Sequence, residues 1–374
     1  MADTGVMAVL DVREAIEWQA RHAEEAHAPR TARVIRAELA ILDGDTATGR
    51  RMATWQGLAL ADAMPLRIAG GLHWLCLSGQ DMRLQPVYAG MVTGQPAIDA
   101  IVADMAARFD APLMAWLDHP PQTNEAGRSA SIMAGLLWLS RRVGPNPSTG
   151  LRTGFELNEI GASAGVNTMM GRYHYDLGGV TAGPSLSRMR IAPEWRGPPP
   201  PAGEVEIVAV RGCDVAPVDL TEPAQALRLK AYVWPEAGAR MDRLDVAIAM
   251  AERAAPDLVQ MDAAEFVREM LARPRDSGVT RALFHSIVWQ YLPDASQRAI
   301  TDLMEQAGAH ATADAPLAWL ALETNRATFR HELRVRYWPG GEQAVHLATA
   351  HPHGAWVEWN GAAGSSDGKN PRKV

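Results

Sequence analysis

The chain has 374 residues, enough for two domains because single hydrophobic cores stop growing near about 250–300 residues. Hydrophobic residues make up 47% and charged residues 21%, the balance of a globular protein rather than of a disordered or fibrous one. The net charge of −7 provides no basic footprint for nucleic acid or an anionic membrane, so we expect neither partner. Composition leaves the oligomeric state open.

The two cysteines, Cys76 and Cys213, lie far apart and outside any Cys/His ligand spacing. A disulfide framework and a structural zinc site are therefore not expected, and no metal-binding pattern is legible. The first residues lack a basic region followed by an apolar stretch, and no segment reaches the ~18 apolar residues of a membrane span. We expect a cytoplasmic protein.

Residues 1–145 are predicted to form an all-helical region. Apolar residues recur three and four apart over residues 12–42, with a break near Pro29 that predicts a helical hairpin. The same periodicity recurs over residues 97–110 and 129–143. The segment Gly144–Gly150, with two prolines and two glycines, then punctuates the chain.

Residues 146–360 alternate short apolar strands with helices. Strands are predicted over residues 153–161, 206–214, 257–262, 281–288 and 317–323. Helices are predicted between them over residues 242–255, 263–273 and 294–308. This alternation predicts an α/β fold with right-handed crossovers and a mostly parallel sheet covered on both faces.

The end of the chain changes character again. Polar and apolar residues alternate on both sides of Pro339, Gly340 and Gly341, which predicts an antiparallel C-terminal hairpin to which residues 354–359 can return. We expect residues 361–374 to form a disordered tail.

The first predicted strand runs into the pattern E-x-G-x-S-x-G, formed by Glu159, Gly161, Ser163 and Gly165. Small residues after a strand let a ligand approach the backbone N–H groups at the start of the next helix. A tight turn with close helix packing is an equally good interpretation of this motif alone.

Two acids end the next two strands. Asp214 follows the second strand, where a carboxylate can accept both hydroxyls of a ribose, and Asp262 with Ala263 follows the third. Each acid alone is more often a helix cap, since Asp at such a junction satisfies unpaired N–H groups. Together with the glycine motif they form a nucleoside-shaped site.

These motifs, followed by the terminal hairpin, resemble the Rossmann-like fold of class I S-adenosylmethionine-dependent methyltransferases over roughly residues 150–360. More closely, the segments TNEAGRS, ELNEIGASAGVNTMMGRYHYD, VRGCDVAPVDLTEP, AYVWPE and FHSIVWQYLP resemble a bacterial family of uncharacterised function over nearly the whole chain. The first resemblance implies S-adenosylmethionine as cofactor and a seven-stranded sheet below the helical region. An insertion must fill the long gap from Gly165 to Asp214.

The methyltransferase resemblance implies a role for each motif residue. Glu159, Gly161, Ser163 and Gly165 would face the methionine and ribose parts of the cofactor. Asp214 would face the ribose hydroxyls, and Asp262 with Ala263 the adenine. A nicotinamide site fits less well, because the G-x-G-x-x-G fingerprint lacks its third glycine.

Three further residues are candidates for orienting a polar substrate. Asn124, Glu125 and Arg128 supply an amide, a carboxylate and a guanidinium within one turn. A helix N-cap at Asn124 is the structural alternative.

Aromatic and histidine residues complete the candidate site. Tyr173 and His174 follow the glycine motif, and His174 is a candidate base because its unperturbed pKa is near ~6.5. His285 and Ser286 end the fourth strand, where they can project into the cleft, with Tyr291 on its wall. Packing within the core is the alternative for each of them.

The sequence thus predicts a methyltransferase acting on a small molecule, with the methyl acceptor unidentified. A methyltransferase-shaped binding or regulatory module without turnover is the alternative, since fold does not establish activity.

Overall fold

The computed structural model describes residues 11–143 and 153–361, which form two compact units. The first unit holds the described residues up to Thr123 together with Leu220–Asp245, and the second holds Asn124–Asp219 and the described residues from Val246 onward. The segment Gly144–Gly150, at which the sequence changes character, and all but the first residue of the predicted tail lie outside the described residues.

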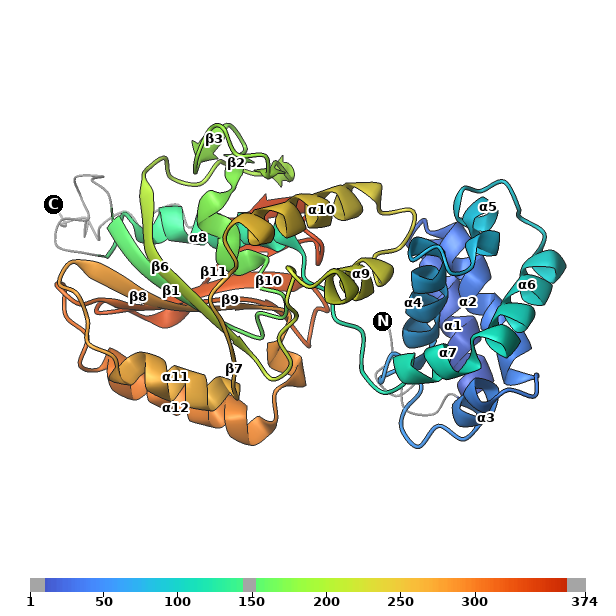
Figure 1. Ribbon diagram of the computed structural model, residues 1–374. Helices are drawn as coiled ribbons and strands as arrows, with labels where there is room; N and C mark the ends of the chain where they lie inside the picture. The colour runs from blue at the N-terminus through green and yellow to red at the C-terminus, as the bar shows by residue number, and fades with distance from the viewer. Residues whose placement is uncertain (1–10, 144–152, 362–374) are drawn as a thin grey trace, which may run out of the picture. The chain divides into compact units, whose positions relative to one another are not determined.

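The first unit is helical, as its sequence predicted (Figure 1). Its helices are α1 (Val12–Glu25), α2 (Pro29–Leu42), α3 (Ala47–Ala53), α4 (Met64–Leu77), η2 (Met82–Leu84), α5 (Gln85–Tyr88), α6 (Gln95–Arg108), α7 (Asp110–Trp116) and α9 (Pro223–Ala231), with the first part of α10 (Gly238–Arg253). The predicted break at Pro29 is confirmed, because proline suits the first position of a helix and not its interior.

Residues 220–245 belong to this helical unit, although the sequence placed them in the α/β region. The Glu236 carboxylate caps α2 by accepting hydrogen bonds from the Arg30 N–H at 2.6 Å and the Thr31 N–H at 3.0 Å. Tyr232 packs against α4 at Gly70, where a Cβ atom would come within 2.7 Å of its ring. Both contacts join residues about 160 or more positions apart, so no local sequence pattern predicts them.

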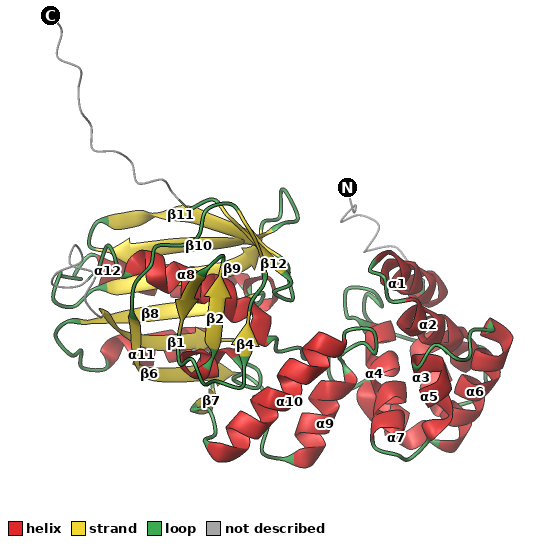
Figure 2. Cartoon of the chain, turned by 90° about the horizontal axis from the view of Figure 1, so that it is seen from above, coloured by secondary structure: helices red, strands yellow, loops and turns green. Residues whose placement is uncertain are grey.

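The second unit is built on a nine-stranded sheet with the order β5-β12-β11-β10-β9-β8-β1-β6-β7. Its strands are β1 (Thr153–Ile160), β5 (Glu194–Arg196), β6 (Val205–Asp214), β7 (Leu258–Gln260), β8 (Val279–Ser286), β9 (Leu317–Thr324), β10 (His331–Trp338), β11 (Gly341–Ala350) and β12 (Trp356–Trp359). Pairing is parallel from β7 to β9 and antiparallel from β9 through β12, which confirms the predicted α/β sheet and hairpin (Figure 2).

The expectation of seven strands is wrong for the described sheet. The return strand β12 pairs with β11, and β5, from the predicted insertion, adds itself in parallel beside β12. The rest of the insertion forms a separate three-stranded sheet, β3-β2-β4, from β2 (His174–Leu177), β3 (Val180–Ala182) and β4 (Arg190–Ile191). Short strands with few apolar residues carry little periodic signal, which is why the sequence missed them.

Helices cover both faces of the large sheet (Figure 1). On one face α11 (Ala263–Ala272) and α12 (Asp294–Gly308) pack Phe266 and Ile300 against Leu283 of β8. On the other face lies α8 (Ser129–Leu139), all of whose residues are buried. A helix that is apolar on every side must be enclosed by other elements, so α8 belongs to the sheet-containing unit, and the boundary predicted near residue 145 differs from the one observed.

Short helical turns join several of these elements: η3 (Ala126–Arg128), η4 (Asn167–Arg172) and η5 (Trp289–Tyr291). None of the helices within residues 11–143 and 153–361 combines the length and the apolar character that crossing a membrane requires.

Candidate functional site

The order of the parallel strands reverses beside β1. If the strands β1, β6, β7, β8 and β9 are numbered one to five in chain order, they lie side by side in the order three, two, one, four, five. In open α/β sheets ligands bind at the carboxyl ends of the strands where the order reverses, which here is between β1 and β8. The two loops that leave these strands are in contact, since a Cβ atom at Gly161 would lie 2.2 Å from Val288.

The loop after β1 is a strained turn. Gly161, Ser163 and Gly165 have φ angles of 65°, 50° and 68°, in the left-handed region. Glycine adopts this region without penalty, but Ser163 does so at a cost that surrounding contacts must offset. At Gly165 a Cβ atom would also come within 2.8 Å of Pro256. Backbone conformation and close packing therefore both require small residues in this motif.

Asp214 and Asp262 both hold backbone N–H groups. Asp214 Oδ2 accepts a hydrogen bond of 2.8 Å from the Ser163 N–H, and its Oδ1 accepts one of 2.9 Å from Ala216. Asp262 caps α11 by accepting from the N–H groups of Ala264 and Glu265. Asp262 thus has the helix-capping role that the sequence left as the alternative, whereas Asp214 holds two N–H groups of loops. An ionised carboxylate has about four lone-pair sites, so capping leaves acceptor capacity for the predicted ribose and adenine contacts.

Glu159 lies at the end of β1 with only 1% of its surface exposed. Burial raises the pKa of its carboxyl well above the usual range, while the Asn167 amide and the Arg128 charge act in the opposite direction. The nearby Asp214 charge raises this pKa further. Burial therefore favours the protonated form of Glu159, which can donate a hydrogen bond as well as accept one.

Buried polar atoms without partners gather around this loop. Glu159 Oε2, Ser163 Oγ and both side-chain amide atoms of Asn167 make no hydrogen bond of normal geometry among the described residues, although the Asn167 amide lies close enough to Glu159 to lower its pKa. Nearly all buried polar groups in proteins are hydrogen-bonded, so each exception requires an explanation. A bound polar ligand is one explanation, because it would offer hydrogen-bond partners to all three side chains at once.

The segment that begins at Asn124 lies against the glycine loop. Asn124 Oδ1 accepts a hydrogen bond of 2.6 Å from the Val166 N–H, and the Tyr173 hydroxyl donates to the Val166 carbonyl. Asn124 and Tyr173, 49 positions apart, thus bind the N–H and the carbonyl of the same residue, Val166, just after the motif. Burial raises the pKa of the Tyr173 hydroxyl well above its usual range, so this phenol stays protonated.

The other substrate candidates divide into buried and exposed residues. Arg128 is buried, with its Nε donating to the Pro352 carbonyl at 2.7 Å and Nη1 lying 3.5 Å from the Ser286 carbonyl. Glu125 accepts from the Gly127 N–H at the start of η3. Tyr291, in contrast, is 72% exposed in η5. Arg128 therefore ties the end of β8 to the candidate site, whereas Tyr291 lies on the surface.

His285 is engaged on both ring nitrogens. Its Nδ1 lies 2.6 Å from Glu323 Oε1, and its Nε2 accepts a hydrogen bond of 2.9 Å from the Trp319 indole. The ring also stacks on Trp289, with centroids 5.1 Å apart. These contacts define an imidazole that is protonated on Nδ1 and oriented by its neighbours. The sequence analysis did not select Glu323, although its position at the end of the fifth predicted strand could have indicated it.

His174 and the tyrosines on either side of it lie in and beside the small sheet. Tyr173 and Tyr175 are fully buried, and the Tyr175 hydroxyl lies 2.9 Å from Ser129 Oγ. His174 is half-buried in β2, and its Nδ1 has no hydrogen-bond partner among the described residues. Packing thus accounts for the tyrosines, and the role of His174 as a base stays a prediction.

A histidine that the sequence did not single out lies along the same edge of the sheet. His331 begins β10, and its Nδ1 is 3.1 Å from the Thr324 hydroxyl at the end of β9. Burial lowers the pKa of His331, and the neighbouring Arg128 and His351 lower it further. His331 reaches this edge because β10 runs antiparallel, so that its first residue lies beside the last residues of β9.

Within the described ranges, no group of three or more His, Cys, Asp or Glu residues is arranged to hold a metal ion.

Comparison with known proteins identifies a family and no characterised relative. The family described as "Uncharacterized protein conserved in bacteria (DUF2332)" matches residues 13–359. Neither a curated protein nor a solved structure matches the chain. Since the family match spans both compact units, the protein belongs to the bacterial DUF2332 family.

Proposed function

We propose that the protein binds S-adenosylmethionine at the carboxyl ends of β1 and β6 and transfers its methyl group to a small molecule. The observation that carries the proposal is the set of buried, unpartnered polar atoms on Glu159, Ser163 and Asn167 beside the reversal of strand order. A ligand with several polar groups would satisfy these atoms.

The arrangement of the residues suggests a division of roles. The Glu159 carboxyl, whose protonated form burial favours, and the Asn167 amide would hydrogen-bond the polar groups of the cofactor. Asp214 would receive the ribose hydroxyls, and Asp262 with Ala263 the adenine. Asn124 and Tyr173 would keep the loop in place through Val166. These fixed contacts would supply orientation, the main contribution that a protein makes to a displacement of this kind.

In the proposed reaction a nucleophilic atom of the acceptor attacks the methyl carbon, and the carbon–sulfur bond breaks with its electron pair leaving on sulfur. A protonated acceptor would in addition have to lose a proton to a base. His174 is the base proposed from the sequence, and His285 and Tyr173 are the other two catalytic candidates.

Binding without turnover is the second candidate function. It is favoured by the contacts of two proposed catalytic residues, because His285 uses both ring nitrogens and Tyr173 donates its hydroxyl proton to a backbone carbonyl. A nicotinamide-binding site has less support, since β10 runs antiparallel where the dinucleotide fold continues its parallel sheet.

Calorimetric titration of the full chain with S-adenosylmethionine and its demethylated product tests the proposal. We expect both to bind, and expect Glu159→Ala, which removes the donor and the acceptor of the carboxyl group, to bind at least about tenfold more weakly. Glu269→Ala, on the exposed side of α11, is the matched control and should bind like the wild type.

The outcomes separate the candidate functions. Absence of binding by both ligands at millimolar concentration would overturn the proposal. Binding without methyl transfer to any acceptor in a metabolite panel would support the second candidate. Binding of a nicotinamide dinucleotide alone would contradict both candidate functions and support a nicotinamide-dependent enzyme.

A further inference from the structure

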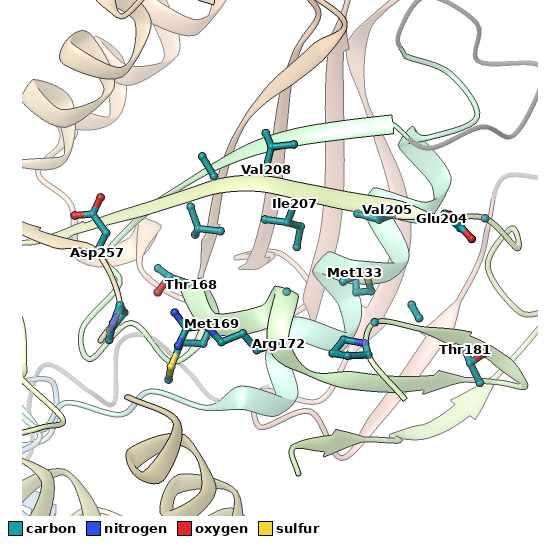
Figure 3. A pocket seen from close by; sticks show the side chains of 18 of the residues that line it. Met133, Thr168, Met169, Arg172, Thr181, Glu204, Val205, Ile207, Val208 and Asp257 are labelled. Carbon is teal, nitrogen blue, oxygen red and sulfur yellow. The ribbon is translucent and has the colours of Figure 1, made fainter. Parts of the chain in front are cut away.

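A cavity of about 760 Å³ lies away from the proposed cofactor site, between β6 and η4 (Figure 3). One wall is the first part of β6, from Val205 to Val210, and the opposite wall is η4 with the turn after β3. The segment Ala255–Asp257, just before β7, closes one end. Its volume is in the range of small-molecule sites, about 300–1,000 Å³.

The cavity exists because this face of the sheet has thin cover. The segment after the β1 loop forms only the six-residue turn η4, where a parallel α/β fold normally places a full helix. The side chains at Val205, Ile207 and Val210 are consequently half-buried rather than buried. The space between β6 and η4 thus follows from the local chain path.

A β-bulge lies in the middle of this wall. Phe155 of β1 pairs with Ile207, but the next residue, Glu156, pairs with Ala209, so that Val208 is the extra residue. Figure 3 shows Ile207 on the side of the strand that faces Met169 and Arg172, with Val208 on the other side. Bulges redirect side chains and are frequent beside functional sites. Here the bulge holds Ile207 toward the cavity and leaves Val208 49% exposed.

The cavity has one long wall along β6, and aliphatic side chains line that wall. Val205 to Val210 extend over roughly 16 Å at the usual rise of a strand. Across from them lie the thioethers of Met133 and Met169, flexible groups that adapt to alkyl chains. None of the described residues that line the cavity is aromatic, so a flat ring would find no stacking partner.

Arg172 provides the polar contact. It is the one cationic side chain among the described lining residues, and its Nη1 donates to the Ala254 carbonyl at 2.5 Å. A guanidinium has five N–H donors in a planar fork that suits a carboxylate, so one bond to the backbone positions the group without exhausting it. Two carboxylates also line the cavity: Asp257, 3.7 Å from Arg211, and Glu204 in the segment before β6.

We propose that this cavity is a second binding site, which takes a medium-length aliphatic carboxylate with its chain along β6 and its carboxylate on Arg172. The site is separate from the one proposed for S-adenosylmethionine and does not depend on it. The two sites are neighbours at η4, where the Thr168 hydroxyl, at the cavity edge, donates to the Gly165 carbonyl, and at Pro256, which lines the cavity and packs against Gly165.

Titration calorimetry of the full chain with decanoate, below its micellar concentration, tests the proposal. We expect saturable binding by the wild type and at least a tenfold loss in Ile207→Trp, whose larger side chain would fill the cavity. Leu186→Trp is the control, at a leucine that is 94% exposed and does not line the cavity, and should change the affinity less than twofold. Ala182→Phe fills the cavity from the opposite wall and serves if Ile207→Trp does not fold.

The head group is tested with decylamine and Arg172→Gln. We expect decanoate to bind at least tenfold more tightly than decylamine and to lose this preference in Arg172→Gln. The proposal is overturned if decanoate does not bind at millimolar concentration, if the cavity-filling variants bind it like the wild type, or if decylamine binds more tightly. Titrating the same variants with S-adenosylmethionine keeps the two proposals separate, because cavity filling should leave that ligand's affinity within twofold.

Discussion

The Ser163 N–H donates a hydrogen bond of 2.8 Å to Asp214 Oδ2, across 51 positions of sequence. This bond joins the ends of β1 and β6 and holds Ser163 in the left-handed region, at a φ of 50°. Its acceptor is charged, and hydrogen bonds to charged groups contribute about 1.5–3 kcal/mol each. Asp214 is thus a structural clamp on the glycine loop, whatever ligand it also binds.

Removing this clamp should destabilise the protein. We expect Asp214→Ala to lower the free energy of unfolding by about 2 kcal/mol, because the Ser163 and Ala216 N–H groups both lose their acceptor. Urea denaturation measures the change. Asp302→Ala, at an exposed position of α12, is the control and should stay within about 0.5 kcal/mol of the wild type. Equal stabilities for the two variants would contradict the clamp.

A methyl group at Gly161 should be poorly tolerated. Gly161→Ala requires a left-handed alanine and places Cβ 2.2 Å from Val288, so we expect a loss of about 2–4 kcal/mol in the free energy of unfolding. The matched control is Gly238→Ala at the first position of α10, where a Cβ atom meets nothing within 4 Å. That variant should be neutral or up to about 1 kcal/mol more stable, because alanine favours helix. A similar loss in both would show that the contact with Val288 is not the cause.

Glu38 in α2 should make the helical unit less stable as the pH rises. Its side chain is fully buried, and neither carboxyl oxygen makes a hydrogen bond of normal geometry among the described residues. Burial raises the pKa of this carboxyl well above its usual range, and the Ala69 backbone lowers it by a smaller amount. The folded chain therefore keeps a proton that the unfolded chain releases. The resulting stabilisation is complete below the unfolded pKa of about 4.3 and is lost as the pH rises from there toward the raised folded pKa, by up to about 1.4 kcal/mol per pH unit.

Two variants and a control measure this effect. We expect Glu38→Gln and Glu38→Leu to reduce the pH dependence of the urea midpoint between pH 5 and pH 8, and Glu38→Leu to be about 2 kcal/mol more stable than wild type at pH 8. Glu25→Gln, at the exposed end of α1, should leave the slope unchanged. Glu159 contributes a slope of the same sign, so the variants should reduce the dependence without abolishing it. An unaltered slope in Glu38→Gln would refute the prediction.

Local periodicity was enough to identify most elements of this protein. Leu317–Thr324 and His331–Trp338 are strands where the sequence predicts them, because each element buries one face and its apolar residues must recur with its own period. The strained positions Gly161 and Gly165 were also visible, since few residues other than glycine adopt positive φ without cost. The resemblance of the motifs to a bacterial family of uncharacterised function agrees with the match over residues 13–359.

Only the tertiary structure decided which of these residues meet. The hydrogen bonds of Ser163 with Asp214 and of His285 with Glu323 join residues 51 and 38 positions apart, and the cap of Glu236 on α2 spans more than 200. Such pairings depend on strand order and on the packing of whole elements, which no local window encodes. For the same reason the cavity beside Ile207 could not be predicted: it exists because η4 ends after six residues and a bulge turns one side of β6 toward it.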